Sequence, residues 1–299
     1  MIIIRPVTIN DAVLTSSDVP EADYSEWLIG SAYTTGNTIQ VTDDTIHSVY
    51  EALGATTGDY PPDNPDKWLR ISATNTWAMF SDQISDTTDQ AVIIAVTLTP
   101  SMVVNAISLF GLDGTDVVVE MDDPIDGIVY SNTVELTDAT ESINNWWSYY
   151  FEPVNRQSDL VLLDLPPYSD ADINITINNA LGTASCGLVS IGTQQLLGTA
   201  NHGTSVSIID YSTKTLDSFG RPVITQRNYS KRASYDVSIP TDQVSSVQSA
   251  LALLRTTPMT WIGDPNNAST IVYGYYRDFD IVIATPTLSS SSIEVEGLT

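Results

Sequence analysis

Positive charge is scarce in this sequence, and its scarcity excludes several classes of partner. The chain has 11 Lys and Arg residues against 37 Asp and Glu residues, a formal net charge of −26. Such a chain repels a phosphate backbone, so we expect neither nucleic acid nor an anionic membrane surface as a partner. Hydrophobic residues make up 42% of the chain, which excludes wholesale disorder and provides for real cores.

Cysteine and histidine are nearly absent. Cys186 is the only cysteine, which excludes an intramolecular disulfide framework, and we expect it to be a small buried residue. The two histidines, His47 and His202, have no second histidine or cysteine nearby. The common zinc spacings are therefore missing, and we interpret both as surface or loop residues. We expect no metal centre and no cofactor.

Long apolar runs are missing as well. The longest stretch worth testing is Ala91–Leu98, far short of the roughly 20 residues that cross a bilayer as a helix. The segment Met1–Pro6 has no basic region before an apolar run, so it does not resemble a secretory signal. We expect no membrane insertion.

The charges divide the chain unevenly. Residues 1–213 hold 29 acidic and 4 basic residues, whereas residues 214–299 hold 8 and 7. This shift predicts a boundary near residue 205, and the polar stretch Ser81–Gln90 predicts a linker. We therefore expect a small aromatic-rich module at 1–81, a second domain at 90–204 and an attachment domain at 205–299.

The pattern of the polar and β-branched residues predicts a mainly β protein. Asp172–Asn178 alternates strictly between polar and apolar residues, which is typical of a strand with one buried face. Short runs of this kind between Asp, Gly and Pro turns predict a jelly-roll or β-sandwich for residues 90–204. The further runs predicted as strands are 91–98, 103–110, 116–121, 127–137, 160–165 and 187–191.

The last segment predicts an α+β domain with one helix. Over Asp242–Arg255, the apolar residues Val244, Val247, Leu251 and Leu254 recur at helical spacing. Thr241 or Asp242 can cap the start, Arg255 suits the C-terminal dipole, and Pro258 prevents continuation. The ranges predicted as strands here are 205–211, 234–239, 270–275 and 279–284.

No catalytic arrangement stands out from the residues. Phosphate-binding glycine loops and nucleophile elbows are absent. A glycosidase needs two carboxylates, but nothing distinguishes a pair among the 37, and we predict that the chain is not an enzyme. The acidic stretch Asp113–Asp126 offers oxygen ligands of the kind that calcium prefers, without the twelve-residue loop pattern. The alternative interpretation is ordinary turn residues.

Aromatic residues carry the strongest binding signal. Trp27, Tyr33, Tyr50 and Trp68 could form a platform that stacks on a sugar ring, or they could form the core of a small module. A second aromatic group contains Trp146 and Trp147. Neighbours on a strand point to opposite faces, so we expect one of these two in the core and the other exposed at an interface or ligand edge.

Residues 24–80 resemble the carbohydrate-binding-like module found in tail and neck proteins of bacteriophages. The resemblance rests on five stretches: Tyr24-x-x-Trp27; Tyr33-x-x-Gly36-Asn37-x-Ile39-x-Val41; His47-x-x-Tyr50-Glu51-Ala52-Leu53; Asn64-Pro65-x-x-Trp68; and Thr74-Asn75-x-Trp77-Ala78-Met79-Phe80. The opening residues 7–14 and 18–21 look like the same proteins. The C-terminal segment is similar to them too, through Asp210-Tyr211-Ser212, Asp217-x-Phe219-Gly220, Arg227-x-Tyr229-Ser230-Lys231-Arg232, Leu254–Pro258, Trp261-Ile262-Gly263, 273–279 and 293–298.

The resemblance implies a structural protein of a tailed bacteriophage, assembled in the bacterial cytoplasm and located in the virion. Its partners would be other proteins of the tail, collar or baseplate, with fibres as one attached class and symmetric self-association within the particle. The nearly neutral C-terminal segment repels partners least, so we expect it to dock. The residues predicted for interfaces are Trp146, Trp147, Arg227, Lys231, Arg232 and Trp261.

Two alternatives remain open at this stage. One is a module that binds host-surface glycan through the four aromatic residues of the first segment. The other is a depolymerase that cleaves host polysaccharide, although the sequence shows no period of the kind that builds a large β-helix.

Overall fold

The computed structural model describes residues 1–43, 45–136, 146–151 and 156–298. Strands account for 53% of the residues and helices for 9%, which confirms the prediction of a mainly β protein. The strands form two large antiparallel sheets and three small ones.

The first large sheet has five strands in the order β11-β10-β13-β8-β2. Its central strand β13 runs over Asp172–Cys186 and includes the predicted alternating stretch. The remaining strands are β2 (Leu14–Ser17), β8 (Thr88–Leu98), β10 (Asp116–Asp123) and β11 (Gly127–Glu135).

The second large sheet has ten strands, nine of them in the order β12-β9-β14-β1-β20-β21-β22-β19-β15, with β16 paired to β19 off this path. The strands that precede residue 205 are β1 (Ile2–Pro6), β9 (Ala106–Phe110), β12 (Leu160–Leu162), β14 (Leu188–Leu196) and β15 (Thr199–Ala200). Those that follow are β16 (Ser205–Asp210), β19 (Tyr229–Pro240), β20 (Met259–Ile262), β21 (Ile271–Val282) and β22 (Leu288–Gly297). The two strands predicted at 270–275 and 279–284 are thus one long strand through residue 282.

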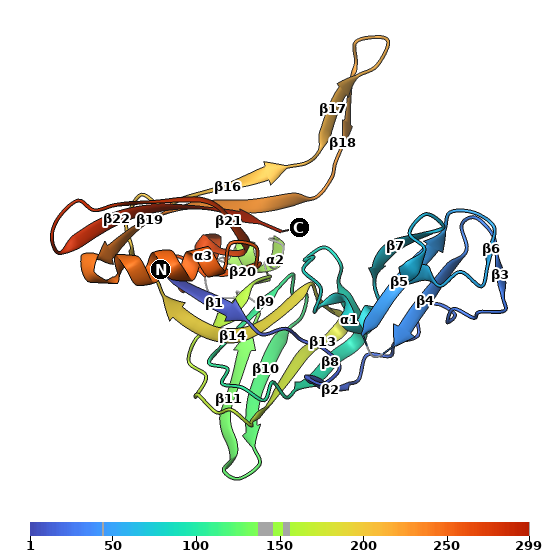
Figure 1. The fold of residues 1–299 in the computed structure, drawn as a ribbon, viewed down its shortest axis with the longest axis horizontal. Coiled ribbons are helices and arrows are strands. Elements are labelled where there is room, and N and C mark those ends of the chain that lie inside the picture. The colour runs from blue at the N-terminus through green and yellow to red at the C-terminus, as the bar shows by residue number, and fades with distance from the viewer. Residues whose placement is uncertain (44, 137–145, 152–155, 299) are drawn as a thin grey trace.

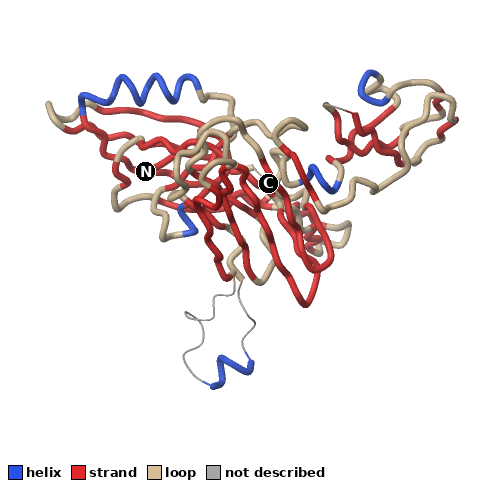
Figure 2. The backbone as a smooth tube through the Cα atoms, turned by 90° about the horizontal axis from the view of Figure 1, so that it is seen from below, coloured by secondary structure: helices blue, strands red, loops and turns tan. Residues whose placement is uncertain are grey.

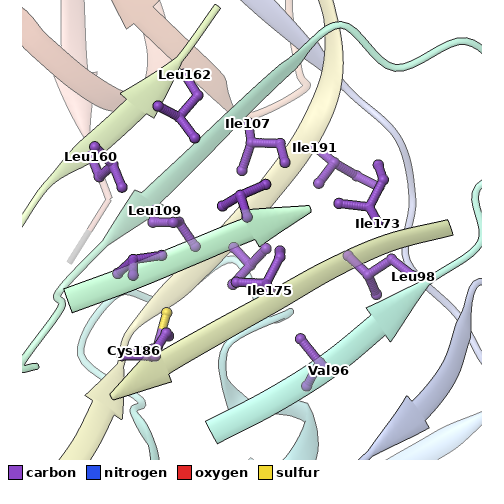
Figure 3. Packing of buried hydrophobic residues seen from close by; sticks show 14 of the residues in the cluster. Val96, Leu98, Ile107, Leu109, Leu160, Leu162, Ile173, Ile175, Cys186 and Ile191 are labelled. Carbon is purple, nitrogen blue, oxygen red and sulfur yellow. The ribbon is translucent and has the colours of Figure 1, made fainter. Parts of the chain in front are cut away.

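A sandwich core lies where one end of the ten-stranded sheet faces the five-stranded sheet. Ile107, Leu109 and Ile191 of the larger sheet meet Ile173 and Ile175 of the smaller one (Figure 3). All five side chains are buried. Fully burying such a side chain contributes about 1.5–3 kcal/mol, so the apolar alternation seen in the sequence stabilises this contact.

The other end of the ten-stranded sheet is covered by one helix (Figure 2). A 3-10 turn, Thr241–Gln243, leads into α3 (Val244–Leu253), whose Val247 and Leu251 are buried against the sheet. The predicted helix is confirmed in type, but the capping prediction is wrong because the 3-10 turn takes up the predicted cap residues. Arg255 does donate to the carbonyl of Ala252 at the C-terminal end.

A small module, separated from the sandwich, contains the aromatic residues of the first segment (Figure 1). Its three-stranded sheet is β4-β5-β7 and its two-stranded sheet is β3-β6. The bounds are β3 (Ala32–Tyr33), β4 (Thr38–Asp43), β5 (Ile46–Ala52), β6 (Thr56–Thr57), a 3-10 turn (Pro61–Asp63) and β7 (Trp68–Ala73). The short helix α1 (Asn75–Ala78) then leads into the five-stranded sheet.

The predicted segments share sheets. β1, from the first segment, pairs with both β14 and β20, one on each side of residue 205. β2, also from the first segment, pairs with β8 of the sandwich. The charge and polarity patterns therefore mark stretches of the sequence, but strands from different stretches pair within the same sheets.

Cys186 is fully buried in the sandwich core, as predicted. Burial raises the pKa of its thiol to about 12. Since the thiolate is the reactive form, we expect a chromogenic disulfide reagent at neutral pH to leave Cys186 unmodified in the native protein. Stoichiometric labelling should follow addition of denaturant, and rapid labelling of the native protein would contradict the burial.

Candidate functional site

A β-arm, which we define as residues 205–229, projects from the ten-stranded sheet (Figure 1). Its root is the pairing of β16 with the first residues of β19. Its outer part is a two-stranded ribbon, β17 (Thr213–Leu216) and β18 (Pro222–Thr225). The residues of β16, β17 and β18 are exposed except for Ile209, so within the described part of the chain the arm extends the sheet as a single layer.

The tip of the arm has a defined turn. The carboxylate of Asp217 accepts hydrogen bonds from the amides of Phe219 and Arg221, both at 2.8 Å. Gly220 has a φ of +76°, a conformation that glycine adopts at little cost. The sequence therefore specifies the tip, and the ribbon has a fixed end rather than an arbitrary loop.

The arm exposes an unusual amount of apolar surface. Every residue of β17 and β18 is exposed, and Phe219 at the tip is 84% exposed. An isolated two-stranded ribbon is marginally stable in water, and a concentration of exposed apolar side chains on one segment is typical of interaction sites. The large exposed apolar side chains of the arm are Val206, Ile208, Tyr211, Leu216, Phe219, Val223, Ile224 and Tyr229.

The arm also differs from the rest of the chain in charge. It holds three basic residues, Lys214, Arg221 and Arg227, and two acidic residues, Asp210 and Asp217. Its net charge of +1 contrasts with −26 for the whole chain. An acidic partner is attracted to this segment and repelled by the remainder.

The basic residues predicted for an interface gather at the root of the arm. Lys231 forms an ion pair with Asp159, and Arg232 pairs with Glu294 at 3.0 Å. Arg227 is exposed, and no carboxylate pairs with it among the residues that the structure describes. A cleft of about 1280 Å³ opens beside Lys231 and Arg232, between the arm root and the segments 156–161 and 265–269.

The three tryptophans predicted for interfaces have different fates. Trp261 is fully buried in the core under α3, and its indole N–H donates to the carbonyl of Gly274 at 2.9 Å. Its assignment to an interface is wrong, because the side chain has no exposed surface.

Trp146 and Trp147 lie on a short helix, α2 (Trp146–Phe151), and both are exposed. The prediction that one of them is buried was wrong because it assumed a strand.

The aromatic residues of the module do not form a shared exposed platform. Tyr50 and Trp68 are buried, and Trp68 donates its indole N–H to the carbonyl of Asp59. Tyr33 meets Trp68 edge-on with ring centroids 5.2 Å apart, and Trp27 meets Tyr60 in the same way. The structure thus supports the alternative in which these aromatics are the module's core.

His47 occupies a position that the sequence reasoning missed. It lies in β5 with its side chain 13% exposed, so the interpretation as a surface or loop residue is wrong. Its Nε2 lies 3.0 Å from a carboxylate oxygen of Asp11, and its Nδ1 lies 2.8 Å from a carboxylate oxygen of Glu21. Its ring stacks on the indole ring of Trp77, with ring centroids 4.2 Å apart. Thr74 donates to the same Glu21 oxygen.

These contacts join the module to the sandwich. Asp11 and Glu21 flank β2 in the sequence, whereas His47 belongs to the module. A pocket of about 640 Å³ opens beside this junction, with Asp11, His47, Arg70 and Trp77 among its lining residues.

We expect His47→Ala to loosen the module from the sandwich while leaving both folded. Hydrogen bonds to charged groups contribute about 1.5–3 kcal/mol, and the substitution removes two of them together with a ring contact. Limited proteolysis should then cut the residues 74–90 faster than in the parent protein. Thr35→Ala, at an exposed site on the module, is the matched control, and equal cleavage rates for the two variants would contradict the role of His47.

The acidic stretch Asp113–Asp126 serves the local structure. Asp113 pairs with Arg156, and Asp123 accepts the amides of Ile125 and Asp126 in the turn between β10 and β11. Within the described parts of the chain, no group of three or more His, Cys, Asp or Glu side chains is placed to hold a metal ion. The turn interpretation is confirmed for Asp123.

None of the helices in the described ranges is both long and apolar enough to cross a membrane. Comparison with known proteins found no matching family model and no matching curated protein.

Proposed function

We propose that this chain is a structural component of a tailed bacteriophage virion and acts as an adaptor or docking protein at the tail, collar or baseplate. The β-arm carries the docking part of the proposal, because it is an apolar, cationic ribbon without cover from the described chain. The virion part is supported by the resemblance of residues 24–80 and 210–298. Fibres are one class of protein that such an adaptor would hold.

The proposed role is not enzymatic. The titratable groups that the fold draws together, His47 with Asp11 and Glu21, hold two parts of the chain against each other. The basic residues at the arm root, Lys231 and Arg232, are paired with carboxylates of the same chain. These groups have a structural task, which fits a docking protein.

An arm-deletion variant tests the proposal in particles. Asp210 and Tyr229 are already paired across the root, so an Asn-Gly turn can replace residues 211–228 without disturbing the sheet. We expect mass spectrometry to find the parent chain in purified particles of the phage that encodes it, and the deletion variant to be missing from them. Absence of the parent chain from particles would refute the virion role.

The control for this experiment is a change of an exposed apolar residue outside the arm. Leu253 at the end of α3 is 76% exposed, so Leu253→Ala should enter particles like the parent chain. Incorporation of the arm-deletion variant at parent levels would refute docking through the arm while leaving a virion role intact.

Glycan binding is a weaker candidate. It requires exposed aromatic faces, and burial removes Tyr50 and Trp68 from the four predicted residues. The Trp27 side chain is partly exposed, and its buried indole N–H has no hydrogen-bond partner in the described chain. Titration with host-surface polysaccharide, followed by Trp27→Ala, tests this candidate; binding that the substitution abolishes would favour it over docking.

A further inference from the structure

We infer that the β-arm docks onto a second copy of this chain, along the open edge of strand β11. The inference rests on the proposed docking function and names its partner. Three features of β11 and its hairpin complement the arm: an unpaired strand edge, a negative charge and exposed apolar side chains.

The first feature is the open edge. β11 ends the five-stranded sheet and pairs only with β10 among the described strands. It is nine residues long, whereas β2 at the opposite edge has four and β12 at the edge of the larger sheet has three. An unpaired strand of this length is a template for addition of another strand. The ribbon β17–β18 likewise has two edges that pair with no other strand of the described residues.

The second feature is charge. Residues 116–135, which form the β10–β11 hairpin, contain six acidic residues and no basic residue. Asp122, Asp126 and Glu135 are exposed, and no cation pairs with them within the described part of the chain. The arm brings Lys214, Arg221 and Arg227. Juxtaposition of the two segments offsets the repulsion between two copies that each carry −26.

The third feature is apolar surface. Ile125 and Ile128 at the hairpin end of β11 are exposed, at 91% and 64%. The arm exposes Leu216, Phe219 and Ile224 on its ribbon and tip. Strand addition would therefore bury apolar side chains on both partners, which supplies the favourable free energy that exposed ion pairs alone do not.

The arm and the β10–β11 hairpin extend from opposite sides of the body (Figure 1). A contact between them uses two different surfaces, so each copy can donate its arm to one neighbour and accept an arm from another. Such head-to-tail contacts generate closed rings when the rotation between copies closes. A ring is the arrangement that an adaptor on a cylindrical tail requires.

A charge-swap experiment tests this contact in solution with the full chain. We expect the parent protein to associate with increasing concentration in sedimentation velocity, and charge reversal on either side to leave only monomers. Combining both reversals in one chain should restore association, because both surfaces then change sign and remain opposite in charge. The arm reversal is Lys214→Glu, Arg221→Glu and Arg227→Glu; the hairpin reversal is Asp122→Lys, Asp126→Lys and Glu135→Lys.

A matched control separates this contact from the effect of net charge. Asp63, Asp66 and Asp242 are exposed away from both surfaces, and changing them to Lys alters the net charge by the same amount as the hairpin reversal. We expect this variant to associate at least as well as the parent. Circular dichroism must show native strand content for every variant.

Cysteine cross-linking tests the position of the contact. Cys186 is buried and is expected to stay unmodified, so introduced cysteines are the reactive ones. We expect a short bismaleimide to link a Thr215→Cys chain to a Thr133→Cys chain when the two are mixed. Thr35→Cys on the module should give no such product with Thr215→Cys.

A parent protein that stays monomeric at all concentrations would overturn the inference, as would a combined reversal that fails to restore association. Equal cross-linking to Thr35→Cys would also overturn it. These outcomes differ from failure of the proposed function. If the chain is present in particles and needs its arm to enter them, yet does not self-associate, the arm binds another virion protein.

Discussion

The Gly192→Ala variant is expected to lose its native fold. Gly192 lies in β14, between Pro6 of β1 and Ala106 of β9. A Cβ at this position would lie 1.9 Å from the carbonyl oxygen of Arg5, a contact that only a shift of the β1 backbone can relieve. The cost should exceed the roughly 1–3 kcal/mol of ordinary overpacking, because the clash is with the backbone in the middle of a sheet. Soluble yield and circular dichroism measure the result.

Gly30→Ala is the matched control for this substitution. No atom lies within 4 Å of a Cβ built at Gly30, which is in the small module. We expect this variant to fold and melt like the parent. A native melting temperature for Gly192→Ala would mean that β1 and β14 are not packed as closely as the structure has them.

Trp261→Ala is expected to be the most destabilising side-chain truncation. Trp261 is 0% exposed, and its ring packs edge-on against that of Tyr276, with ring centroids 6.0 Å apart. Its indole N–H donates a hydrogen bond to the carbonyl of Gly274. Truncation of a buried tryptophan leaves a cavity and costs about 3–5 kcal/mol. For a chain of this size we expect the melting temperature to fall by about 10 °C.

Leu253→Ala, on the exposed end of α3, is the control for Trp261→Ala and should melt like the parent protein. A melting temperature of Trp261→Ala equal to that of the parent protein would contradict the close packing of this side chain in the core.

Patterns within single strands and helices could be read from the sequence. The alternation over Asp172–Asn178 predicted which face of β13 is buried, and Ile173, Ile175 and Ile177 are all buried. The spacing of Val247 and Leu251 predicted α3 and its buried face. These features depend on neighbours close in the sequence, so periodicity reports them directly.

Pairings between distant residues could not be read in this way. Nothing local to Ile2–Pro6 indicates that β1 lies between β14 and β20, because strand pairing depends on partners far along the chain. The role of His47 was missed for the same reason, since its partners Asp11 and Glu21 are 36 and 26 residues away. The sequence did predict a strand at 205–211, at the root of the arm, but its exposure is a property of the folded chain.

The place of β1 has a consequence for the timing of biogenesis. β1 pairs with Gly192–Leu196 on one side and with Thr260–Ile262 on the other, so it must wait for partners far along the chain. Contacts of such high sequence separation slow folding, because a long loop must close before they form. β1 therefore reaches its full pairing in the ten-stranded sheet only after Met259–Ile262 has been synthesised, and the arm projects from that same sheet. In the proposed docking, a nascent fragment without Met259–Ile262 would lack the complete sheet from which the arm projects.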